Sequence, residues 1–134
     1  MSTITLSLDD QRTVQTAAHG VVTLLACADR GRAGAISMAA AAALTSATGL
    51  VGHVVNDKKA KPNVKGRTVA DIADVVLPAL TASVRILETE APQEVGNFRG
   101  TIATAISAAE QVYGGRPHPA AAELIRKING ALAA

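Results

Sequence analysis

The chain has 134 residues and a mass of 13.6 kDa, a size typical of one domain that buries about two-thirds of the surface of its unfolded form. Hydrophobic residues make up 49% of the chain and charged residues 18%, which excludes an intrinsically disordered protein. One tyrosine, one phenylalanine and no tryptophan supply few rings for stacking on bases, so single-strand nucleic-acid binding is disfavoured. We therefore expect a single globular domain over residues 1–134.

Location is suggested by the cysteine content and by the start of the chain. Cys27 is the only cysteine, so no internal disulfide forms, and residues 1–6 lack the basic and apolar regions of a secretory signal. Residues 33–56 carry no charge over 24 positions, but they consist largely of alanine with interspersed Ser, Thr and Gly. This composition is too weakly apolar to favour a membrane span, and we expect a cytoplasmic protein.

Apolar residues recur at helical spacing in four places, and no stretch shows the alternation of a strand. This pattern predicts an all-α fold, a compact alanine-rich bundle of five to six helices. The first helix is expected to begin after a Ser7 cap followed by Asp9 and Asp10, and to end near Gly31 in a left-handed conformation. Its predicted inner face consists of Val14, Ala18, Val21, Leu25 and Ala28.

A second helix is predicted from about Ala33 to Leu44, and residues 45–52 either continue it or break it at Gly49 and Gly52. A helix without charge on any face is normally covered on all sides. Two arrangements would bury the uncharged segment: it is the central helix of the bundle, or its small residues pack against the same helix of a second chain in a symmetric dimer.

The third predicted helix begins after Thr68, whose hydroxyl is a suitable cap. Because proline lacks an N–H and crowds the preceding turn, Pro78 predicts a kink near residues 74–78 or two shorter helices. The predicted buried face consists of Val69, Ile72, Val76, Leu80, Ser83 and Leu87.

A fourth helix is predicted to begin at Pro92 and to end at Gly114 and Gly115, and a last short helix to begin near His118. The inner face of the fourth is expected to hold Phe98, Ile102, Ala105, Ile106, Ala109 and Val112, and that of the last helix Leu124, Ile125, Ile128 and Leu132.

Metal ligands at helical spacing, such as Glu-x-x-His or His-x-x-x-His, do not occur in the sequence. His19, His53 and His118 lie far apart in sequence, and Cys27 fits a small buried hydrophobic residue. We therefore expect no metal site, no cofactor and no catalytic residue.

His53 and Asp74 are the candidate ligand-binding residues. His53 lies in the uncharged segment, and Asp74 lies four residues before Pro78, where unpaired backbone groups would help to line a polar cavity. The alternative for each is ordinary: a histidine bonded to a backbone carbonyl, and a solvated carboxylate.

A cluster of basic residues forms the strongest charge feature of the sequence. It places five positive charges within residues 58–67, whereas the rest of the chain carries 8 basic and 11 acidic residues. Such a loop either contacts phosphates of a nucleic acid or an acidic surface, or is a solvated connector. No recognition helix adjoins it, so nucleic-acid binding is the weaker interpretation. The basic patch consists of Lys58, Lys59, Lys61, Lys65 and Arg67.

Residues 22–31 (VTLLACADRG) resemble the end of the first core helix in helical proteins similar to the tellurite-resistance B family, in which an alanine-rich helix closes on an Ala-Asp-Gly turn. Residues 87–94 (LETEAPQE), followed by Phe98 and Arg99, resemble bundles of uncharacterised bacterial proteins of similar length. Arg30 interrupts the turn in this chain, and the acidic residues of the family's next helix are missing between Ala33 and Asn56. The resemblance therefore implies a helical fold and transfers no functional residue.

These observations predict a non-catalytic helical module that forms a homo-oligomer or docks a protein partner. One alternative is a small-molecule binding protein or enzyme with a cavity near His53, Asp74 and Pro78. A second, weaker alternative is nucleic-acid contact through the loop from Lys58 to Arg67.

Overall fold

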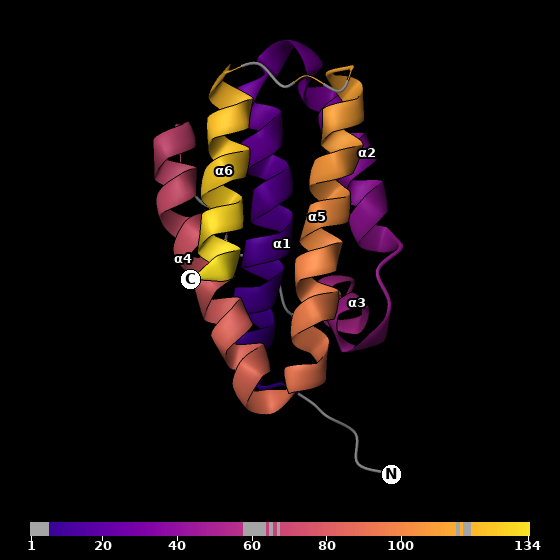
Figure 1. Cartoon of the computed structure of the whole chain (residues 1–134), viewed down its shortest axis with the longest axis vertical. Helices are drawn as coiled ribbons and strands as arrows, with labels where there is room; N and C mark the ends of the chain where they lie inside the picture. Colours follow the sequence, from indigo (N-terminus) through magenta and orange to yellow (C-terminus); the bar gives the residue numbers. More distant parts are fainter. Residues whose placement is uncertain (1–5, 58–63, 65, 67, 115, 117–118) are drawn as a thin grey trace.

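A computed structural model describes residues 6–57, 64, 66, 68–114, 116 and 119–134 (Figure 1). These residues fold into six α-helices and two 3₁₀ turns, as the all-α prediction requires. In chain order the elements are α1 (Leu8–Ala28), η1 (Arg30–Arg32), α2 (Ala33–Thr45), α3 (Gly49–Val55), α4 (Val69–Glu90), η2 (Pro92–Glu94), α5 (Val95–Val112) and α6 (Pro119–Ala133).

The two predicted N-terminal caps are confirmed. The hydroxyl of Ser7 accepts a hydrogen bond from the N–H of Asp10, and that of Thr68 accepts one from the N–H of Asp71, each at 3.1 Å. The predicted left-handed end of α1 is wrong, because Gly31 lies within the 3₁₀ turn η1, which leads directly into α2. Beyond the end of α5, by contrast, the backbone does become left-handed at Gly114, with φ +72°.

Helices α2 and α3 are separated, so the predicted break near Gly49 and Gly52 is the alternative that forms. Gly49 begins α3 with φ +69°, a conformation that favours glycine. A side chain at Gly52 would collide with the backbone carbonyl of Ala47, which lies in the connection between the two helices. The two glycines therefore allow α3 to fold back tightly against the end of α2.

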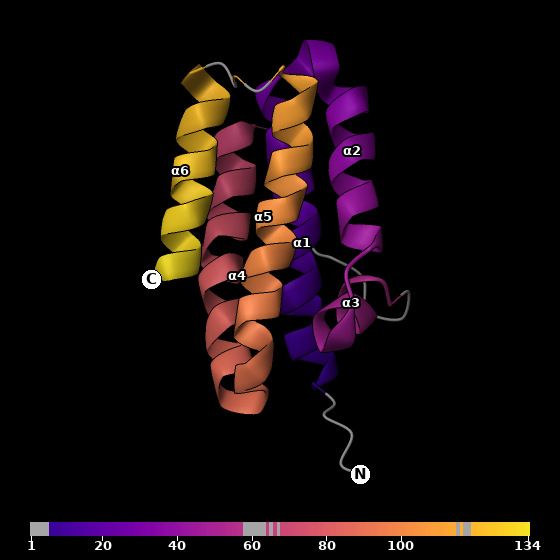
Figure 2. The ribbon, with the colours of Figure 1, turned by 45° about the vertical axis from the view of Figure 1, so that its right-hand side comes forward.

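Helix α4 continues as one helix through Pro78, so the predicted alternative of two shorter helices is wrong, whereas the kink near residues 74–78 stays a prediction. Figure 2 shows α4 as one ribbon between α6 and α5. The carbonyl that loses its intrahelical partner is that of Asp74, and Asp74 and Pro78 are both exposed residues of the helix.

The centre of the bundle is α1, which contacts each of the other five helices. The central-helix hypothesis for residues 33–56 is therefore wrong. Helix α2 lies at the edge opposite α6 (Figure 2), packs on α5 and α1, and buries only Ile36, Ala40 and Leu44. The alanines of α2 are compatible with a buried position at the centre of the bundle and with an exposed position at its edge, because a methyl group contributes little free energy on burial.

Most of the predicted core residues are buried; Ala28, Val69, Val112 and Ile125 are half-buried. The largest fully buried side chains are Phe98, Leu24, Leu25, Ile36, Leu44, Leu80, Leu87, Ile102 and Ile128. Within the described part of the chain, no helix combines the length and the apolar character needed to cross a membrane.

Candidate functional site

The two residues predicted to bind a ligand are on different helices and face solvent. His53 is exposed on α3, Asp74 is exposed on α4, and neither borders the three grooves described below. The histidine that meets a backbone carbonyl is instead His19 of α1, whose Nε2 lies 2.9 Å from the carbonyl oxygen of Val55. All five residues of the basic patch, Lys58, Lys59, Lys61, Lys65 and Arg67, lie outside the described residues.

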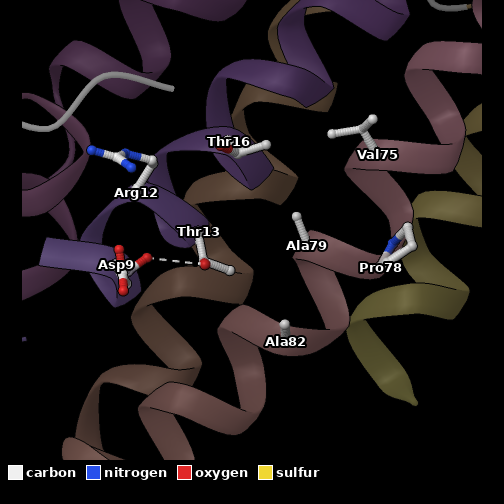
Figure 3. Close-up of a pocket in the computed structure, with 8 residues that line it drawn as sticks. All are labelled: Asp9, Arg12, Thr13, Thr16, Val75, Pro78, Ala79 and Ala82. Atoms are coloured by element: carbon white, nitrogen blue, oxygen red, sulfur yellow. Dashed lines mark hydrogen bonds between the residues drawn. The ribbon is translucent and has the colours of Figure 1, made fainter. Parts of the chain in front are cut away.

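Pro78 does line a groove, but with α1 as its other wall. This α1–α4 groove has a volume of about 470 Å³ (Figure 3). In Figure 3 the guanidinium of Arg12 points away from the α4 residues. The lining residues are Asp9, Arg12, Thr13, Thr16, Val75, Pro78, Ala79 and Ala82.

The chemistry of the α1–α4 groove is sparse. The hydroxyl of Thr13 already donates to the backbone carbonyl of Asp9 at 3.1 Å, as the dashed line in Figure 3 indicates. The α4 wall consists of aliphatic side chains and the ring of Pro78. Nucleophilic catalysis requires a nucleophile held next to a base. The lining offers the hydroxyls of Thr13 and Thr16 and the carboxylate of Asp9, but the hydroxyl of Thr13 bonds to the backbone of Asp9 and not to its carboxylate.

A second groove lies between α5 and α6 and is lined by Arg99, Ala103, Asn129, Leu132 and Ala133. Its charged side chain has a structural role, because Nε of Arg99 donates to the carbonyl of Leu132 at 3.1 Å. The guanidinium thereby satisfies a carbonyl in the last turn of α6, where backbone acceptors lack intrahelical partners.

Helices α2 and α5 pack against each other, and their outer sides together form the most distinctive surface among the described residues. We call it the α2–α5 face. Every residue that defines it is exposed and uncharged, and Met38, with 77% of its surface accessible, is the most exposed large hydrophobic residue described. The face consists of Gly34, Ala35, Met38, Ala41, Ala42 and Thr45 from α2, and Gly96, Gly100, Ala103, Thr104, Ser107 and Gln111 from α5.

Two glycines on α5 have no steric role within the chain. A methyl group added to Gly96 or Gly100 would meet no atom within 4 Å. Glycine in a helix interior costs roughly 0.5–1 kcal/mol relative to alanine. Gly20 shows the usual reason to bear this cost, since a side chain there would collide with Val76. No contact within the described chain explains why α5 has glycine at positions 96 and 100.

A groove of about 370 Å³ lies on this face, between the C-terminal half of α2 and the N-terminal half of α5. Its lining contains no charged residue: Ala43, Ser46, Ala47, Thr48, Gly96, Asn97, Gly100, Thr101 and Thr104. The face therefore combines a protruding apolar side chain, Met38, with an uncharged depression next to Gly96 and Gly100.

Known proteins provide no further assignment. No protein-family model, curated protein or solved structure matches this chain. Within the described residues, no group of three or more His, Cys, Asp or Glu side chains is placed to hold a metal ion. The resemblance of residues 22–31 to the tellurite-resistance B family stays a prediction.

Analysis of the sequence singled out the uncharged segment of α2 but missed its neighbour on α5. The signal was present as Gly96-x-x-x-Gly100, a spacing that puts both glycines on the same side of a helix. The predicted inner face of α5 already leaves both glycines on the outer side of that helix, but the tertiary structure was required to show that they border a groove shared with α2.

Proposed function

We propose that this chain is a non-catalytic helical module that docks a protein through the α2–α5 face. The observation that carries the proposal is the exposure of Met38 in the middle of a surface without charge. Exposed apolar patches on small proteins commonly mark interaction surfaces, and methionine adapts its shape to a partner.

The distribution of charge supports the same function. The two helices α2 and α3 comprise 13 and 7 residues without a single Asp, Glu, Lys or Arg, whereas 18% of the whole chain is charged. Charged residues are typically depleted from the centre of a protein interface. On α6, by comparison, Glu123, Arg126 and Lys127 are all exposed.

Site-specific photo-crosslinking tests the proposal. A photoreactive side chain is introduced at Met38, and at Ala122 as the matched control, since Ala122 is also exposed on a helix but lies on α6. In cells that naturally produce the chain, we expect discrete covalent adducts from position 38 and none from position 122. Equal labelling from both positions, or no adduct from position 38, would contradict the docking function.

A further inference from the structure

Resting on this docking function, we infer that the occupant of the α2–α5 face is a second copy of this chain, packed about a two-fold axis that passes near Ala42. In a two-fold interface the same surface is used by both partners and must complement itself. Three properties of the face meet this condition: its charge, its shape and its area.

The first property is the absence of charge. Residues close to a two-fold axis meet their own copies, so a charged residue there faces an identical charge. Like charges in contact across an interface cost several kcal/mol. Each of the twelve residues of the α2–α5 face is neutral. Arg99, the exposed charge that lies next to Ala103, is bonded to the carbonyl of Leu132 on the α6 side of α5.

The second property is the pairing of a projection with a depression. Met38 protrudes from the N-terminal half of α2, and the groove lies beside Ala43, Ser46 and Ala47 at its C-terminal end. Ala42 is exposed between them along the helix. A two-fold axis near Ala42 exchanges the two ends, so that Met38 of each copy is brought to the groove of the other.

Gly96 and Gly100 fit this arrangement because they form the α5 wall of the groove. With nothing within 4 Å of either Cβ position, both leave room for a partner to approach the α5 backbone closely. Small residues at i and i+4 allow such close contact between helices. The second copy thus explains two glycines that the isolated chain does not.

The third property is area. Helix α2 has 13 residues and is therefore about 20 Å long. Two packed helices present a face about 20 Å wide. The face therefore measures roughly 400 Å² on each partner, less than the roughly 800 Å² that a standard interface buries, and this size is typical of weak and transient association. We therefore expect a reversible dimer with a dissociation constant on the order of micromolar.

Sedimentation velocity and disulfide trapping on the full chain test the inference. Wild-type protein is examined across concentrations on both sides of the micromolar range. Ala42→Cys is prepared in a Cys27→Ser background, or Cys27→Ala if the serine variant does not fold, and is then oxidised. Ala122→Cys in the same background is the control, because it also replaces an exposed helical alanine.

We expect the sedimentation coefficient to rise from monomer to dimer with concentration, and Ala42→Cys to form a covalent dimer much faster than Ala122→Cys. Residues beside the axis lie close enough to their own copies for the Cα separation of about 4.4–6.8 Å that a disulfide requires. A monomer at every concentration, or equal rates of disulfide formation, would overturn the inference.

The two proposals fail in distinguishable ways. If the purified chain is a monomer but position 38 still gives discrete adducts heavier than two chains in cells, the docking function holds and the second copy is refuted. If position 38 gives no adduct at all and the chain is a monomer, both proposals are refuted.

Discussion

The carboxylate of Glu94 caps helix α3 at Val51, 43 residues earlier in the chain: Oε1 of Glu94 accepts a hydrogen bond from the backbone N–H of Val51 at 3.0 Å. The same oxygen accepts from Nδ2 of Asn97 at 3.3 Å, and that nitrogen also donates to the carbonyl of Thr48 at 2.8 Å. Because Thr48 and Asn97 line the α2–α5 groove, these bonds fix the end of the groove as well as the start of α3.

Glu94→Ala is expected to lower the free energy of unfolding by about 1–2 kcal/mol, because it removes a charged cap from a helix N-terminus. Urea denaturation measures the change. Glu88→Ala is the control, since Glu88 is exposed on α4, and substitutions at such positions usually change stability by about 0.5 kcal/mol or less. An equal decrease in the free energy of unfolding of Glu94→Ala and Glu88→Ala would contradict a stabilising role for the Glu94 cap.

The opposite end of α3 is held by Gln15 of α1, which is 1% exposed. Its Nε2 donates to the carbonyls of Val54 at 2.8 Å and Asp57 at 2.7 Å, whereas its buried Oε1 has no partner within the described structure. We expect Gln15→Leu to lower the free energy of unfolding by about 1–2 kcal/mol. The loss of two hydrogen bonds destabilises the fold, and the removal of the unpaired Oε1 offsets only part of that loss.

Urea denaturation again provides the measurement, and Gln93→Leu is the control because Gln93 is exposed in η2. Amide hydrogen exchange adds a local readout: protection in α3 is expected to fall in Gln15→Leu and to persist in the control. Unchanged stability and unchanged protection would mean that Gln15 does not anchor α3.

The single tyrosine makes an alkaline titration readable, because the chain has no tryptophan. Burial raises the pKa of Tyr113, and the carboxylate of Asp29 raises it further, while Arg32 acts in the opposite direction. The phenolic hydroxyl donates to the carbonyl of Leu25 at 3.3 Å. We therefore expect the tyrosinate absorbance of the folded protein to appear above the usual pH of about 10.

The same shift predicts the sign of the pH dependence. Since the folded state retains its phenolic proton above pH 10 and the unfolded state does not, the contribution of Tyr113 to stability is complete below about pH 10. It is lost as the pH rises through the folded-state pKa. A midpoint equal to that measured in concentrated urea would contradict the burial of the hydroxyl.

Two helical glycines give opposite predictions for the same substitution. Gly20→Ala is expected to lower the free energy of unfolding by about 1–3 kcal/mol, because the added methyl group collides with Val76 in the core. Gly130→Ala is expected to raise it by about 0.5–1 kcal/mol, because that position on α6 is open. Thermal and urea unfolding test both variants, and changes of the same sign would contradict the packing of α1 on α4.

Local signals in the sequence predicted most of the fold correctly. The caps at Ser7 and Thr68 depend on side chains within three residues of their partners, and the buried faces of α1 and α4 follow from the helical period. The turn at Gly31 was predicted wrongly because a 3₁₀ turn and a left-handed glycine end a helix at similar sequences.

Properties that depend on contacts between distant segments could not be predicted. Which histidine meets a carbonyl depends on α1 packing against α3, which selects His19 and leaves His53 exposed. The position of α2 was equally hidden, because a run of alanines has no polar side that identifies its solvent-facing surface. That Gly96 and Gly100 of α5 line a groove together with residues of α2 emerged only from the structure, because it depends on how the two helices pack.

The most direct test of the α2–α5 face as the self-association surface compares Gly100→Gln with Gly130→Gln by sedimentation at one concentration above the dissociation constant. Both variants place the same uncharged side chain at an open helical glycine, and both are expected to stabilise the monomer, because glutamine favours a helix more than glycine does. The dimer is predicted to be lost in Gly100→Gln and kept in Gly130→Gln. Dimers of equal strength in both variants would contradict the account.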